Sequence, residues 1–93
     1  MLRLNCFVKV EEANKLKVLE AAKRLTEASL KQDGCIAYDI FESATRADVL
    51  MFCETWRDQK ALDDHANSDV FKREVAIIES LAEMKLEKFD FNH

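Results

Sequence analysis

The spacing of apolar residues along this chain changes from two to three or four and back again, and the order of these changes constrains the fold most. Residues 2–10 (LRLNCFVKV) alternate apolar with mixed side chains, which is the pattern of a half-buried strand. From Glu12 the spacing becomes three or four, as on an amphipathic helix of about five turns. The residues with this helical spacing are Leu16, Leu19, Ala22, Leu25 and Ser29.

The single glycine of the chain marks the end of this helix. Gly34 follows Gln32 and Asp33, where a residue in the left-handed conformation is expected after a helix C-terminus. Residues 35–43 and 49–56 are rich in β-branched and aromatic side chains, which is typical of strands. The segment between them is short enough for a hairpin.

The second half of the chain returns to helical spacing and ends on a strand. Asp58 is a candidate N-cap for a short helix over 59–66. Ser68 or Asp69 caps a longer helix, whose apolar residues are Phe71, Val75, Ile78 and Leu81. Residues 85–91 read as a last strand, with Phe89 and Phe91 on one side and Leu86 on the other. The order β-α-β-β-α-β predicts an α+β fold of the ferredoxin-like kind.

The length of 93 residues allows one domain, which we expect to span residues 1–93. Both faces of the predicted sheet carry large apolar residues, which an open antiparallel sheet with one face in water would not. A second copy of the chain would cover the face that the helices leave free, so we expect a homodimer. Periodicity alone does not say which set of residues faces the helices.

Charge and composition exclude several classes of protein. The 18 acidic and 14 basic residues are mixed along the chain, whereas nucleic-acid binders concentrate basic residues on one face. There is no apolar run of about 20 residues and no signal-peptide pattern, so we expect a cytoplasmic protein without membrane contact. Cys6, Cys35 and Cys53 lack zinc or disulfide spacing and are expected to be small buried thiols. No glycine-rich phosphate loop or ligand cluster predicts a metal or another cofactor.

Two stretches resemble the antibiotic biosynthesis monooxygenase superfamily. Residues 53–71 (CETWRDQKALDDHANSDVF) resemble its Glu-x-Trp-x-Asp, Ala-Leu, His and Ser-x-x-Phe pattern, and residues 33–39 (DGCIAYD) resemble its turn into the second strand. With the matching element order, the resemblance covers nearly the whole chain. It implies a dimeric α/β-barrel with a small pocket in each subunit between sheet and helices. Known members include cofactor-independent oxygenases of quinols and polyphenols, haem-degrading enzymes, and an isomerase of a phosphorylated signalling sugar derivative.

Two polar residues are candidates for catalysis. His65 matches the family histidine, and a neutral imidazole can take a proton from a phenol or an enolisable carbon. Alternatively, His65 caps the short helix or bonds a backbone carbonyl at the dimer edge. Asn5 interrupts an apolar strand and coincides with an asparagine of some oxygenase members. It would orient a substrate carbonyl or an oxyanion if its strand face lines the pocket; otherwise it is exposed or structurally bonded.

Three aromatic residues are candidates for substrate binding. Trp56 and Phe71 would supply flat walls for an aromatic substrate, and Tyr38 would donate to a substrate oxygen. The alternative for all three is the ordinary core. Glu54 shares a strand face with Trp56 and is expected to pair with an Arg or Lys across the dimer. Haem degradation is not expected, since Val75 stands where the haem-degrading members carry their ligating histidine.

These observations predict a cofactor-independent monooxygenase of a quinol-like or polyphenolic aromatic. In such an enzyme a base forms an electron-rich phenolate or carbanion, which reduces dioxygen directly. One alternative is an isomerase or another proton-transfer enzyme on a small oxygenated metabolite, in which His65 moves a proton and no oxygen is consumed. The other is a dimeric ligand-binding module without catalysis. The identity of the small-molecule substrate stays open.

Overall fold

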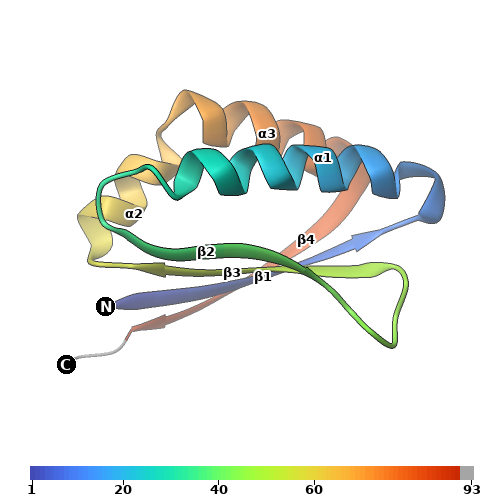
Figure 1. Ribbon diagram of the computed structural model, residues 1–93, viewed down its shortest axis with the longest axis horizontal. Helices are drawn as coiled ribbons and strands as arrows, with labels where there is room; N and C mark the ends of the chain where they lie inside the picture. The colour runs from blue at the N-terminus through green and yellow to red at the C-terminus, as the bar shows by residue number, and fades with distance from the viewer. Residues whose placement is uncertain (91–93) are drawn as a thin grey trace.

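The structure, a computed structural model, describes residues 1–90 and has the element order β-α-β-β-α-α-β (Figure 1). This order confirms the predicted ferredoxin-like α+β fold. The elements are β1 (Leu2–Val10), α1 (Glu12–Ser29), β2 (Cys35–Glu42), β3 (Val49–Trp56), α2 (Gln59–Ala66), α3 (Asp69–Leu81) and β4 (Ala82–Asp90).

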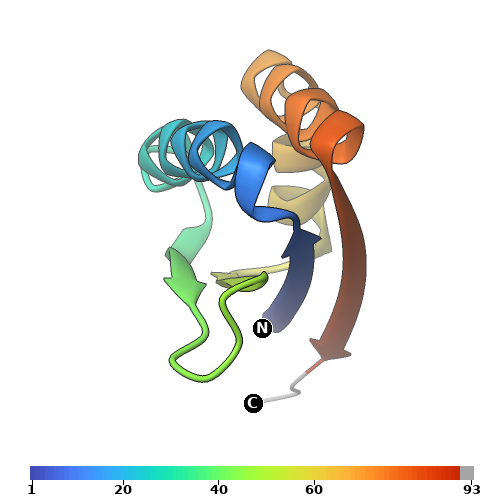
Figure 2. The same ribbon diagram turned by 90° about the vertical axis from the view of Figure 1, so that its right-hand side faces the viewer.

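The four strands form one antiparallel sheet in the order β2-β3-β1-β4. All three helices lie on the same face of this sheet, and the other face carries no helix (Figures 1 and 2). Residues directly opposite one another in neighbouring strands share a face. Leu4 of β1, for example, lies opposite Glu54 of β3 and Lys88 of β4, so these three side chains lie on one side of the sheet.

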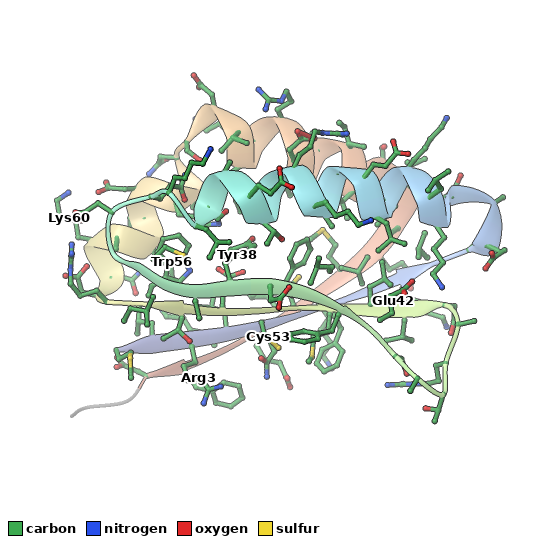
Figure 3. All side chains as sticks on the ribbon, in the orientation of Figure 1. Arg3, Tyr38, Glu42, Cys53, Trp56 and Lys60 are labelled. Atoms are coloured by element: carbon green, nitrogen blue, oxygen red, sulfur yellow. The ribbon has the colours of Figure 1, made fainter. Side chains whose placement is uncertain are left out.

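The register settles which face of β1 is covered by the helices. The even-numbered residues of β1 face the helices and are buried, together with Leu50 and Phe52 of β3. Arg3, Asn5 and their odd-numbered neighbours lie on the helix-free face. Figure 3 shows Arg3 and Cys53 on that side of the sheet, while Tyr38 and Trp56 point toward the helices.

Helix α1 buries four of the five residues of its predicted stripe at least in part and leaves only the first of them outside. Leu16 is 69% exposed, whereas Val18, Ala21, Ala22 and Leu25 are buried. Each residue advances by about 100° around an α-helix, so Leu16 lies nearly opposite the stripe that Val18 and Leu25 share. The alanines let the helix lie close to the sheet, and the large leucine is left outside.

Gly34 has the predicted left-handed conformation, with φ of 82°, but it does not end α1. The helix ends at Ser29, and two further turns follow, in which the Lys31 and Gln32 amides donate to the carbonyls of Ala28 and Ser29. Gly34 therefore ends this turn and leads into β2. The prediction was right about the conformation and wrong about the helix boundary.

The remaining boundaries were largely predicted. The side chains of Asp58 and Ser68 accept hydrogen bonds from the amides of Ala61 and Phe71, as expected of the two N-caps. Strand β4 begins at Ala82, three residues before the predicted start, because it pairs with the whole length of β1. Phe91, where that strand was predicted to end, lies outside the described residues.

None of the helices in residues 1–90 is both long enough and apolar enough to cross a membrane. The cysteines are free, with Cys6 buried and Cys35 and Cys53 half-buried. The prediction of small buried thiols therefore holds fully for Cys6 alone.

Candidate active site

A cavity of about 520 Å³ lies between the helix-facing side of the sheet and the helices, and all seven elements contribute to its lining. The walls are mainly apolar, with Leu25, Phe52 and Phe71 among them. Exposed side chains of Gln59, Lys88 and others lie at its rim. A mainly apolar cavity with few polar groups is the usual form of a small-molecule site.

The structure brings four of the five predicted site residues together. His65, Tyr38 and Phe71 line the cavity, and the Trp56 ring packs against His65 with 4.5 Å between the ring centroids. The corresponding distances from His65 are 4.9 Å to Phe71 and 5.4 Å to Tyr38. These residues come from β2, β3, α2 and α3, so the cluster exists only in the folded chain.

The fifth predicted residue, Asn5, lies elsewhere. It is half-buried on the helix-free face, opposite Cys53 of β3 and Glu87 of β4. The apolar even-numbered residues of β1 face the helices, so strand alternation turns Asn5 away from the cavity. Within one chain the expected role of Asn5 beside His65 is therefore wrong.

His65 is buried as a neutral ring. Its side chain is 2% exposed, and burial lowers its pKa from about 6.5 to about 4, so the imidazole carries no charge at pH 7. Its Nδ1 lies 2.6 Å from Oε1 of Gln32. Its Nε2 is buried and has no hydrogen-bond partner among residues 1–90.

The alternative role of His65 as a structural cap is not what the structure shows. The cap at the start of α2 is Asp58, and the hydrogen bond of the His65 ring goes to a side chain instead of a backbone carbonyl. The backbone carbonyl of His65 accepts hydrogen bonds from Ser68, but those contacts do not involve the imidazole ring. A buried ring nitrogen without a partner requires an explanation, and a ligand that donates a proton to it is one.

Glu54 is a second ionisable group in the lining. It is 8% exposed, and its Oε1 accepts a 2.8 Å hydrogen bond from the indole Nε1 of Trp56. Burial raises the pKa of this carboxyl group, while hydrogen bonds from Trp56 and Tyr38 act in the opposite direction. Glu54 faces the helices of its own chain, where Trp56 is its hydrogen-bond partner, and the expected Arg or Lys across a dimer stays a prediction. The Glu-x-Trp spacing, which puts both residues on one strand face, was the signal for this pair.

Tyr38 supplies a hydroxyl group that stays protonated. It is 5% exposed on the helix-facing side of β2, and its ring meets those of Phe52 and Trp56 edge to face. Burial raises the pKa of this phenol well above its usual value, and the nearby negative charge of Glu54 raises it further. The hydroxyl group therefore stays protonated at any ordinary pH, and its hydrogen bond to Glu54 uses the one proton it can donate.

Gln32 is the site residue that sequence reasoning missed. It lies in the turn between α1 and β2, and nothing in its surroundings along the chain points to His65, 33 residues later. The rim residues Gln59 and Lys88 were missed as well; Lys88 Nζ donates to Gln59 Oε1 over 2.6 Å. Val75, which lines the cavity, offers no metal-ligating atom. In residues 1–90 no group of three or more His, Cys, Asp or Glu side chains is placed to hold a metal ion.

Comparison with known proteins adds to this geometry. A family model described as antibiotic biosynthesis monooxygenase matches residues 1–76. The crystal structure of a conserved Bacteroides thetaiotaomicron protein of unknown function, described as a possible oxidoreductase, is 58% identical and superposes with a TM-score of 0.95, covering 97% of this chain and 96% of that chain. A crystal structure of an antibiotic biosynthesis monooxygenase is 25% identical with a TM-score of 0.91, and both chains are covered completely.

Two relatives are similar in sequence. YcnE of Bacillus subtilis, provisionally named a monooxygenase, is 28% identical over 76 residues, which is 82% of this chain and 80% of YcnE. An uncharacterized protein of Synechocystis sp. is 31% identical over 64 residues, which is 69% of this chain. That match spans only 44% of the Synechocystis protein.

Proposed function

Because this chain belongs to the antibiotic biosynthesis monooxygenase family, we propose that it is a cofactor-independent monooxygenase of a quinol-like or polyphenolic aromatic. The observation that carries the proposal is the neutral His65 in the wall of an aromatic-lined cavity, whose buried Nε2 has no hydrogen-bond partner within the described residues 1–90. A phenolic hydroxyl group is the kind of donor that this atom lacks.

His65 acts as the base in this proposal. A phenol with a pKa near ~10 and an imidazole with a pKa of about 4 differ by an amount that makes complete proton transfer unfavourable by roughly 8 kcal/mol. The imidazolium and phenolate so formed, about 3 Å apart, attract one another by on the order of 5 kcal/mol at an effective dielectric constant of about 20. The unfavourable free energy of proton transfer that remains is small enough for proton removal to accompany electron transfer.

The substrate supplies the electrons in the proposed reaction. The activated aromatic reduces dioxygen, one oxygen atom enters the product, and the other leaves as water with two hydrogens from the substrate. Phe71 is the proposed flat wall for the ring. The Tyr38 hydroxyl group is the proposed donor to a substrate oxygen, which would replace Glu54 as the acceptor of its proton. Trp56 stacks behind His65 and fixes the imidazole plane.

We also propose that the working form is a homodimer joined through the helix-free face of the sheet. That face carries large apolar side chains that one chain leaves wholly or partly exposed, namely Phe7, Phe41, Met51 and Phe89. Leaving such a patch in water is unfavourable, and a second copy of the same sheet would cover it.

An isomerase or other proton-transfer activity is the second candidate. The observation in its favour is that Glu54, whose pKa burial raises, and the neutral His65 line the same cavity as a potential acid and base. The third candidate, a module that only binds a ligand, was expected to show a filled pocket or a solvent-facing His65. Neither feature is present.

Oxygen uptake with a panel of hydroquinones and naphthoquinols tests the proposal. His65→Gln removes the base, so kcat should fall roughly 10²–10⁴-fold. Lys60→Gln, an exposed change on the same helix, is the control and should leave uptake unchanged. Since the pKa of His65 is lowered to about 4, kcat/KM should already be on its plateau at pH 7. The proposal fails if the wild type consumes no more oxygen than His65→Gln; conversion of a substrate without oxygen uptake would favour the isomerase.

A further inference from the structure

We propose that Gln32 is a positioning residue that holds His65 in the tautomer protonated on Nδ1, and so makes Nε2 the base. This inference rests on the proposed function for its catalytic meaning, although the tautomer itself can be observed without any substrate. It assigns a role to a residue that touches His65 and does not line the cavity.

The argument starts from what the two side chains can donate. The amide oxygen of Gln32 only accepts hydrogen bonds, and it lies 2.6 Å from Nδ1 of His65. The ring is neutral at pH 7, so it carries one proton, and this contact places that proton on Nδ1. Nε2 is then left with a lone pair.

The opposite tautomer would be unfavourable at both nitrogens. The Nδ1 lone pair would face the lone pairs of the Gln32 oxygen, and a buried N–H group on Nε2 would have no acceptor. Such a pair of mismatches favours the Nδ1–H form by roughly 10-fold or more. The contact therefore selects the form of His65 that can take a proton from a ligand.

The backbone fixes Gln32 from both sides. Its amide donates to the Ser29 carbonyl over 3.0 Å, and its carbonyl accepts from the Cys35 amide over 3.2 Å. The side chain therefore extends from a fixed point in the turn after α1. A mobile backbone at Gln32 would give a weaker preference for one tautomer, since ordering the side chain would then cost more conformational entropy.

Gly34 brings this turn within reach of α2. A Cβ atom at position 34 would collide with the Cβ of Ala61, which lies one helical turn before His65. The turn passes beside α2 in Figure 1. Arg57 holds the turn through two further contacts. Its amide donates to the Gly34 carbonyl over 2.8 Å, and its guanidinium group forms an ion pair with Asp33 over 3.2 Å.

Long-range ¹H–¹⁵N correlation spectra test the tautomer directly. In a His93→Gln background His65 is the sole imidazole of the chain. At pH 8 the wild-type ring should show a protonated Nδ1 and an unprotonated Nε2. Gln32→Met, which has a similar length and no oxygen, should shift the population toward Nε2–H by about 10-fold. Lys31→Met, an exposed change in the same turn, should leave the spectrum unchanged.

A conservative variant separates positioning from mere folding. Gln32→Glu keeps an oxygen acceptor, so it should retain the Nδ1–H tautomer and raise the pKa of His65 through its charge. If oxygen uptake is found, Gln32→Met should lower kcat more than it changes KM, and Gln32→Glu should restore kcat with the pH profile moved upward.

The inference is overturned if the wild-type ring carries its proton on Nε2, or if Gln32→Met leaves the tautomer unchanged. A wild type that consumes no oxygen, with a tautomer that still follows residue 32, supports the positioning role and contradicts the monooxygenase. Oxygen uptake that depends on His65 but not on the tautomer contradicts the positioning role alone.

Discussion

At the scale of single residues, the chemistry of the cavity depends on the aromatic rings that surround the His65 imidazole. The sequence could single out His65, Tyr38 and Phe71 because short motifs and strand periodicity are local signals. The structure brings all three to one cavity, and their roles stay predictions. The ordinary histidine pKa near ~6.5 was the natural expectation, but three aromatic rings surround the imidazole and lower the value to about 4. That environment is assembled from four elements, so no local pattern reveals it.

The lowered pKa predicts a loss of stability in mild acid. The folded pKa of His65 is about 4, below the unfolded value of ~6.5, so between these values the unfolded chain binds more protons than the folded one. The stability that the neutral ring contributes is therefore fully present above pH ~6.5 and is lost as the pH falls toward ~4. The loss should be on the order of 3 kcal/mol.

Urea unfolding of the wild type and His65→Gln at several pH values between 4 and 7.5 measures this effect. The variant lacks the imidazole and keeps every carboxyl group, including Glu54, so the difference between the two curves isolates His65. The difference should narrow or reverse as the pH falls. Parallel curves across the range would show that His65 is not desolvated in solution.

At the scale of the elements, α1 and α3 are joined by an ion pair between an exposed arginine and a buried glutamate, which the sequence did not predict. Glu74 of α3 is 1% exposed, and Arg24 of α1 donates from Nε and Nη2 to both its carboxylate oxygens at 3.0–3.1 Å. Arg73 adds a longer contact of 3.4 Å. Arg24 lowers the pKa of Glu74. The caps of α2 and α3 were predicted because they lie within four residues of their partners, whereas this pair joins residues 50 apart.

Arg24→Met should be markedly destabilising, because it leaves the buried Glu74 carboxylate with only the weaker Arg73 contact. The free energy of unfolding should fall clearly, although water around the half-exposed guanidinium group keeps the loss below that expected of a fully buried pair. Arg24→Met combined with Glu74→Leu should recover much of it, since no charge is then left buried. Lys23→Met, at an exposed neighbouring position, is the control for denaturant unfolding. If Arg24→Met is no less stable than Lys23→Met, the pair does not contribute to stability as proposed.

At the scale of the whole molecule, the order of elements predicted the fold, but it did not predict which face of the sheet the helices cover. Apolar residues alternate with others on every strand, and large apolar side chains occur on both faces, so period two alone cannot choose between them. The choice depends on where α1 and α3 pack. The predicted stripe of α1 is buried apart from Leu16, but the stripe does not say which face of the sheet it covers. Asn5 was misplaced for the same reason.

The helix-free face predicts self-association. The wild type should have a mass near twice the chain mass of 10.8 kDa in light scattering at micromolar concentration. Phe41→Glu places a charge on the helix-free face, where the phenylalanine is 49% exposed, and should dissociate the dimer. Leu16→Glu alters an equally apolar, exposed residue on α1 and should not. A monomeric wild type, or dissociation by both variants alike, would contradict the proposed interface.

The contact between Gly34 and Ala61 also limits how the sequence can change over evolution. A side chain at 34 would occupy the space of the Ala61 methyl group, and the backbone there has a φ of 82° that other residues rarely adopt. The strain at position 34 stays whatever residue stands at 61, so descendants of this sequence should keep the glycine.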